Sequence, residues 1–203
     1  MNLLLDGGEL PSADCVGQPL SQVLDTLASV LAEEGRVIVS VQVNDEPPEA
    51  ECLAAPFDGE SDAVVAVRSV GLKEHLIASL RESERLLPEL ALSVRELGSK
   101  FLRITDLDLR EDFSECVSNL NDFFQFLAQL EASTPGPCAN IPMGDATVAS
   151  HNAAMRQLLE EVVSAFAAKD FVRMSDLMQY EVAPTLEAYA HIMPRMVSEI
   201  EAA

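Results

Sequence analysis

Basic residues are scarce in this chain, which has 13 Lys and Arg against 34 Asp and Glu and a net charge of −21 at pH 7. Such a charge repels phosphate backbones and anionic membrane surfaces, so we expect neither nucleic-acid binding nor membrane binding. The chain is nevertheless 48% hydrophobic, whereas a disordered acidic segment would be poor in apolar residues. The carboxylates therefore cover a folded protein, where they either provide solubility or attract a basic partner.

Long apolar runs and paired cysteines are also missing. No stretch approaches the roughly 18 apolar residues of a membrane span, and the first residues lack the basic region of a signal peptide. No two cysteines form the C-x-x-C pair that is typical of zinc or redox sites. The four cysteines are Cys15, Cys52, Cys116 and Cys138. We therefore expect a cytoplasmic protein with reduced thiols.

Motifs that carry chemistry are absent as well. The sequence has no phosphate-binding G-x-x-x-x-G-K-[ST] or G-x-G-x-x-G loop and no G-x-S-x-G nucleophile turn. It has no Glu-x-x-His pair of the kind that di-metal helical bundles use. We accordingly predict no catalytic residue, no cofactor and no bound metal. Glu187 and His191 stand four residues apart, so they either bind a metal weakly or form an ordinary exposed pair.

Residues 1–70 read as a small acidic α/β domain. They contain 13 acidic residues and only two basic ones, Arg36 and Arg68. Apolar periodicity predicts strands over 2–6, 36–43 and 63–70, with a short strand near Cys52 to Ala54. A helix is predicted over 18–34, because Leu and Val recur there at helical spacing and Gly35 follows.

From Leu72 onward the apolar period changes to 3.6, which predicts four amphipathic helices. These helices cover about 72–101, 108–131, 148–168 and 173–201. Pro88 predicts a kink or break in the first helix, and Pro184 predicts a kink in the last. The fold class is thus α+β, with an N-terminal α/β domain over 1–70 and a mainly antiparallel four-helix bundle over 71–203.

Together these features favour a non-catalytic, intracellular interaction protein, such as an adaptor, an acidic chaperone-like protein or an assembly regulator. The alternative is an enzyme or metal-binding helical bundle that uses Glu187, His191 and nearby carboxylates. We expect a protein partner, and the charge of the chain would suit a basic one. We also expect a homodimer, because long helices with apolar seams can bury surplus surface by self-association.

Two regions are candidate partner sites. The first is a set of carboxylates between two predicted strands: Asp45, Glu46, Glu49, Glu51, Asp58, Glu60 and Asp62. The second is the predicted kink before Pro184, where Tyr180 and Glu181 either border a groove or lie on a helix that simply bends around the core. Methionines in the same helix could line an adaptable groove or fill the core.

Overall fold

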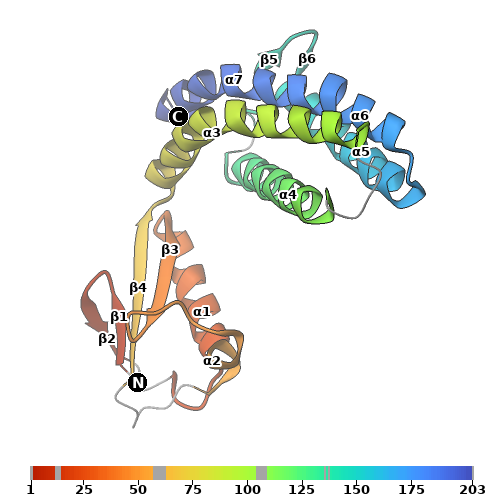
Figure 1. The fold of residues 1–203 in the computed structure, drawn as a ribbon. Helices are drawn as coiled ribbons and strands as arrows, with labels where there is room; N and C mark the ends of the chain where they lie inside the picture. The colour runs from red at the N-terminus through yellow and green to blue at the C-terminus, as the bar shows by residue number, and fades with distance from the viewer. Residues whose placement is uncertain are drawn as a thin grey trace. The chain divides into compact units, whose positions relative to one another are not determined.

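The computed structural model describes residues 2–11, 15–56, 63–103, 109–134, 136 and 138–202. The chain divides into two compact units, Met1–His75 and Leu76–Ala203. A small sheet lies in the first unit, and helices make up nearly all of the second (Figure 1). The mixed α+β class predicted from the sequence is confirmed. None of the helices in the described ranges is both long and apolar enough to cross a membrane.

Four strands form the sheet of the first unit: β1 (Asn2–Leu5), β2 (Gly8–Leu10), β3 (Arg36–Val43) and β4 (Val64–Gly71). Their order in space is β2-β1-β4-β3. β1 runs parallel to β4, and the other two neighbouring pairs are antiparallel. The three-residue strand β2 follows the tight turn after β1, where Asp6 and Gly7 have positive φ.

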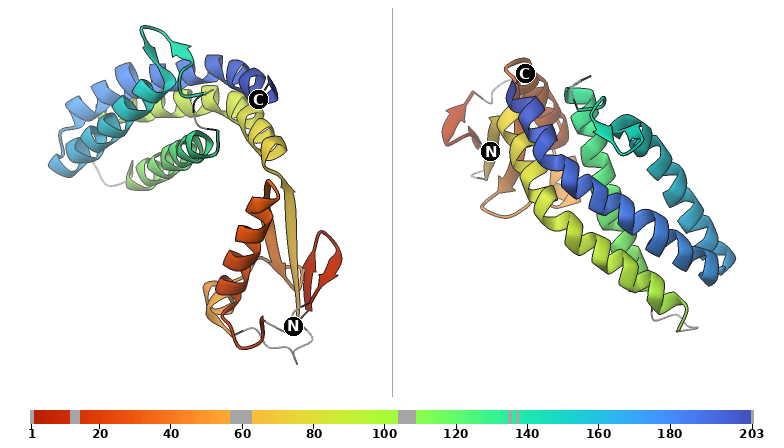
Figure 2. Two further views of the ribbon diagram at one scale, coloured as in Figure 1. Left: turned by 180° about the vertical axis from the view of Figure 1, so that it is seen from behind. Right: turned by 90° about the horizontal axis from the view of Figure 1, so that it is seen from above.

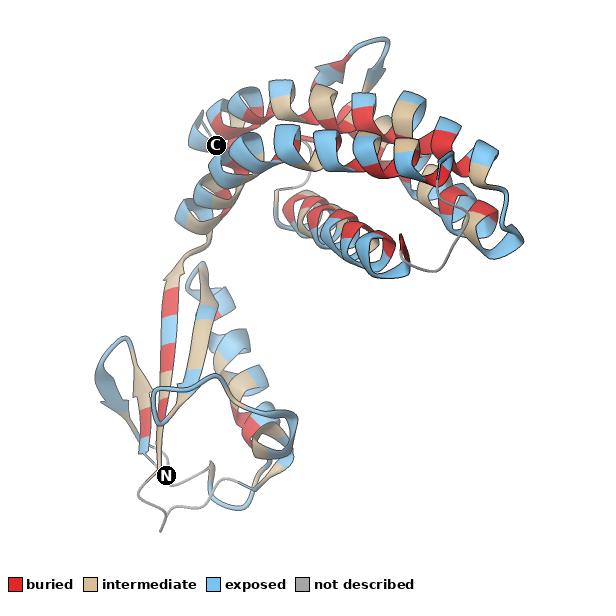
Figure 3. Ribbon diagram, in the orientation of Figure 1, coloured by how far each residue is buried: buried red, intermediate tan, exposed pale blue. Residues whose placement is uncertain are grey.

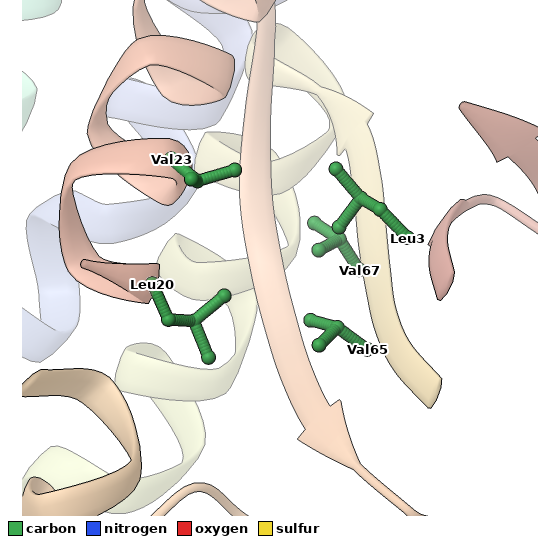
Figure 4. Close-up of a cluster of buried hydrophobic side chains, with 5 residues drawn as sticks. All are labelled: Leu3, Leu20, Val23, Val65 and Val67. Carbon is green, nitrogen blue, oxygen red and sulfur yellow. The ribbon is translucent and has the colours of Figure 1, made fainter. Parts of the chain in front are cut away.

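Helix α1 (Leu20–Glu33) packs on the sheet through an apolar face. The central core residues of this unit are Leu3, Leu20, Val23, Val65 and Val67, drawn in Figure 4. A short helix, α2 (Ala50–Ala54), occupies the place where the sequence predicts a short strand. That prediction was wrong, because the alanines at both ends of this apolar run favour a helical turn over a strand.

A polar network joins three elements of the first unit. The Asp6 carboxylate accepts hydrogen bonds from the Ser69 amide at 2.7 Å and from the Ser69 hydroxyl at 2.8 Å. The Arg36 guanidinium donates to the same carboxylate at 2.8 Å and to the Ser69 hydroxyl. Hydrogen bonding to Ser69, with a further contribution from Arg36, lowers the pKa of Asp6. The left-handed turn at Asp6 is thereby fixed against β4.

Three long helices and one segmented helix dominate the second unit. They are α3 (Leu72–Phe101), α4 (Arg110–Ser133), α5 (Val148–Ala168) and the continuous path of α6 (Phe171–Leu177), η3 (Met178–Val182) and α7 (Ala183–Ala202). Two-residue strands, β5 (Pro142–Met143) and β6 (Ala146–Thr147), form a small hairpin before α5. Sequence periodicity did not predict this hairpin or strand β2.

Ion pairs show how α3 and α7 run past each other. Arg81 pairs with Glu201 at 3.0 Å, and Arg95 pairs with Glu187 at 2.9 Å. The later residue of α3, Arg95, pairs with the earlier residue of α7, Glu187, so the two helices are antiparallel. They lie side by side in Figure 1 and in both views of Figure 2. Their facing sides are buried, as the red bands of Figure 3 show.

The prolines inside the helices have different effects. α3 continues through Pro88 as one helix, so the break that the sequence allows does not occur. Pro184 follows a π-helical turn, η3, in which the amide of Ala183 donates to the carbonyl of Met178. This wide turn ends at Val182, two residues before Pro184. Pro184 has no N–H, so it cannot donate the ordinary α-helical hydrogen bond to the carbonyl of Tyr180.

Candidate functional site

A groove of about 720 Å³ lies between α3 and α4. Leucines spaced along α3 and three residues of α4 give it an apolar floor. These residues are Leu86, Leu87, Leu90 and Leu97 on α3 and Cys116, Phe123 and Phe126 on α4. Spacings of three, four or seven residues separate Leu86, Leu90 and Leu97 on α3 and Cys116, Phe123 and Phe126 on α4, so each set lies along one side of its helix. Leu87 directly follows Leu86.

The burial of the floor residues differs along the groove. Leu87 and Leu97 are buried, Leu90 and Phe126 are half-buried, and Leu86 is 41% exposed. Leu86, Leu90 and Phe126 therefore keep apolar surface that the protein's own side chains do not cover. Covering such surface is favourable by about 25 cal/mol per Å². The groove can thus gain free energy from an apolar ligand or partner.

Carboxylates form the two rims of this groove. Glu89 and Glu96 stand on α3, and Glu115 and Asp122 stand on α4, all of them exposed. In the part of the chain that the structure describes, no basic side chain lies within ion-pair distance of Glu96, Glu115 or Asp122. The rims thus carry uncompensated negative charge on both sides of an apolar floor.

One end of the groove is closed. Lys100 on α3 pairs with Asp112 on α4 at 3.0 Å, and both residues line the groove. Beyond them lies a set of aromatic rings: Phe101 packs edge-on against Phe113 at 6.0 Å, and Phe113 stacks on Phe166 at 4.2 Å. This cluster ties α4 to α3 and α5, so the groove ends at a fixed point.

A second groove, of about 440 Å³, lies on the other flank of α4, against α5. Val117 and Leu120 of α4 face Leu159 and Val163 of α5 across it. Cys116 borders both grooves and is 7% exposed. Burial, helped by the charge of Glu115, raises the pKa of the Cys116 thiol to about 11. The thiol is therefore protonated near neutral pH and is a poor nucleophile.

The acidic residues predicted as a partner site belong to the first unit. Asp45 and Glu46 lie in the turn after β3, where Asp45 has a φ of 66°. Glu49 occupies the N-cap position of α2 without a side-chain capping hydrogen bond, and Glu51 is in the first turn. All four are exposed. The remaining members of this predicted site lie outside the described residues; they are Asp58, Glu60 and Asp62.

Tyr180 and Glu181 lie on the π-helical turn and are exposed, Tyr180 to 72%. Neither lines the grooves described above. Two other residues of the same turn, Met178 and Val182, are buried and line the groove between α4 and α5. The turn therefore contributes to a groove through Met178 and Val182, and not through Tyr180 and Glu181 as the sequence indicated.

The residues of the metal-binding alternative have other contacts. The Glu187 carboxylate pairs with Arg95 at 2.9 Å, and His191 is exposed one helical turn further along α7. Across the described ranges, no three His, Cys, Asp or Glu side chains come together as a metal would require. Glu187 thus acts in a contact between α7 and α3.

The groove between α3 and α4 was not predicted from the sequence, although each half of it was visible there. The acidic positions Glu89 and Glu96 recur at seven residues, as do Glu115 and Asp122. Each pair predicts an acidic stripe on one helix. The separation of the two helices, which makes the stripes into opposite rims, depends on packing that the sequence pattern does not contain.

Comparison with known proteins places part of the helical unit in a family. Residues 80–192 match a family described as a domain of unknown function (DUF8042). This range begins in α3 and ends in α7, so it includes both grooves. No curated protein and no solved structure shows significant similarity to the chain.

Proposed function

The chain belongs to the DUF8042 family, and we propose that it is a non-catalytic interaction protein that binds a protein partner in the groove between α3 and α4. The observation that carries this proposal is the partly exposed apolar floor bordered by exposed carboxylates. The matched family range contains every residue of that groove. The proposed binding surface therefore lies within the segment that matches the family.

The shape and chemistry of the groove favour a protein segment. On α3 it extends from Ser83 to Lys100, which corresponds to about 25 Å at 1.5 Å per residue. A long, open groove with an apolar floor is the type of surface that accepts an amphipathic helix.

The helical unit itself is proposed to be the antiparallel four-helix bundle that the sequence predicts, with α6, η3 and α7 together as its fourth helix.

The enzymatic or metal-binding alternative receives less support. Of its two named residues, Glu187 pairs with Arg95, and His191 is exposed. The Cys116 thiol at the groove is held protonated by burial. No observation among the described side chains favours a particular reaction, so interaction remains the proposed function.

A pair of leucine substitutions on α3 tests the proposal. Helical peptides of about 17 residues would be selected from a display library against the wild-type protein, since this length spans the groove at 1.5 Å per residue. Leu86→Asn should weaken the selected peptides about tenfold, which corresponds to about 1.4 kcal/mol. Binding would be measured by fluorescence anisotropy.

Leu92→Asn is the matched control, because Leu92 stands on the same helix, is 53% exposed and does not line the groove. The control should bind the selected peptides as the wild type does. If both variants bind alike, or if selection yields no peptide, the proposed use of the groove is wrong.

A further inference from the structure

We infer that the partner's segment is a basic amphipathic helix, whose apolar face lies on the floor of the groove while its Lys and Arg residues reach the two acidic rims. This inference rests on the proposed function, and it specifies the chemistry of the partner. The charge pattern of α3 and α4 carries it.

The rims match the geometry of such a helix. On each side of the floor, two carboxylates stand seven residues apart: Glu89 and Glu96 on α3, and Glu115 and Asp122 on α4. Seven residues correspond to two helical turns, so each rim presents charge at regular intervals of about 10 Å. Long basic side chains can cover apolar surface with their stems while their charged ends reach these carboxylates.

The ion pair at the closed end of the groove sets the position of the partner's basic residues. At the closed end, Lys100 neutralises Asp112. The uncompensated charge therefore begins about one helical turn from this end, at Glu96 and Glu115, and continues along α4 to Asp122. Basic residues of the partner are expected there, and the closed end favours an uncharged residue.

A second copy of this chain is a poorer occupant of the groove. Each copy has a net charge of −21, so a second copy would bring like charges to acidic rims. Any homodimer contact is therefore expected at another surface. An acidic or neutral partner helix would face the same repulsion or lack the rim contacts.

Two synthetic 18-residue peptides test the inference. Both have Leu at positions i, i+3, i+4 and i+7, and the remaining positions are Lys in one peptide and Glu in the other. Binding would be measured by fluorescence anisotropy at low and high salt. The Lys peptide should bind with strong salt dependence, and the Glu peptide should bind at least a hundredfold more weakly.

Matched protein variants separate local from general charge effects. The rim variant Glu96→Gln/Glu115→Gln/Asp122→Asn should weaken the Lys peptide about tenfold, since exposed charge pairs are each worth up to about 1 kcal/mol. The control Asp25→Asn/Glu33→Gln/Glu34→Gln removes the same charge from exposed positions of the first unit that belong to neither candidate site, and it should change the affinity less than twofold. Lys100→Gln should tighten binding, because it leaves Asp112 uncompensated.

The outcomes distinguish this inference from the proposed function. Equal losses in the rim and control variants would mean that the Lys peptide responds only to overall charge, and the inference would be overturned. If the Lys and Glu peptides bind alike, and both are weakened by Leu86→Asn, the groove binds protein but its rims do not select a basic partner. The inference is also overturned if neither peptide binds. A change of oligomeric state in Leu86→Asn, measured by light scattering, would identify a second copy as the occupant.

Discussion

Gly98 allows α3 to approach the π-helical turn closely. A Cβ atom at this position would lie 3.0 Å from Cγ of Gln179 and 3.1 Å from Cβ of Met178. Beside it, the Ser99 hydroxyl donates to the Gln179 side-chain oxygen at 3.1 Å, and Gln179 donates to the Ser175 hydroxyl at 2.6 Å. Close packing and a short chain of hydrogen bonds therefore fix the irregular turn to α3.

Gly98→Ala should lower the free energy of unfolding. Alanine gains about 1 kcal/mol of helix propensity over glycine, but overpacking a tight contact costs about 1–3 kcal/mol. Urea unfolding followed by circular dichroism would measure the difference. The control is Ser118→Ala, at an exposed position of α4. This change gains helix propensity without a new contact, so it should be neutral or slightly stabilising. A stabilised Gly98→Ala would show that the contact is looser than described.

Asp6 is expected to make the first unit sensitive to acid. Because Ser69 and Arg36 lower its folded pKa, the carboxylate stabilises the native state above its ordinary pKa of about 3.9, and this contribution is lost as the pH falls through the lower folded pKa. Asp6→Asn should lower the melting temperature at pH 7, and the difference from wild type should shrink at pH 3. Differential scanning calorimetry would measure both, with exposed Asp25→Asn as the control. A difference that is the same at both pH values would rule out this linkage.

At the scale of single elements, α4 stands out because grooves border both of its flanks. Two of its contacts are between rings: Phe113 stacks on Phe166, and Phe123 packs edge-on against Tyr189 at 5.5 Å. Helices α3 and α7, by contrast, are linked along their length by ion pairs and facing buried residues.

Hydrogen exchange should therefore be faster in the middle of α4 than in the middle of α7. Local opening needs less free energy where fewer apolar contacts are broken. Exchange followed by mass spectrometry would compare the two helices in the same sample, and a peptide that fills the groove should slow exchange in α4. Protection in α4 equal to that in α7 would contradict this view of the helix.

The elements that sequence predicted well are those with a long apolar period. Helices α3 and α5 were expected over 72–101 and 148–168, which are their bounds in the structure. Short elements were missed, because β2 has three residues and β5 and β6 have two each, too few to show any periodicity. The π-helical turn was also missed: Pro184 signalled a disturbed helix, but not how the backbone would adapt.

The whole molecule consists of two compact units, and α3 begins at the end of the first. A fragment of residues 71–203 keeps α3 intact and contains every residue of both grooves. We predict that it is helical, melts cooperatively and binds the Lys peptide with the affinity of the full chain. Far-UV circular dichroism and anisotropy would measure this. An insoluble or non-cooperative fragment would mean that the first unit is needed to complete the helical one.

The candidate site illustrates what composition alone can establish at this scale. The excess of acid over base indicated a basic partner, but it directed attention to residues 45–62, where carboxylates are dense in sequence. The groove instead takes its carboxylates from α3 and α4, in positions up to 33 residues apart, Glu89 and Asp122. Carboxylates that are close together in the sequence and carboxylates that are close together in space are different sets, and the fold determines the second set.

One of the two tyrosines, Tyr189, makes the core of the helical unit visible to spectroscopy. The chain has no tryptophan, and while Tyr180 is 72% exposed, Tyr189 is fully buried, donates its hydroxyl proton to Asn152 and lies against Phe123 and Phe124. Burial also raises the pKa of Tyr189. In a Tyr180→Phe variant, all near-ultraviolet tyrosine signal would come from the core, and phenolate absorbance in alkali would appear only as that core opens. The native protein thus contains its own optical probe of unfolding, without an added label.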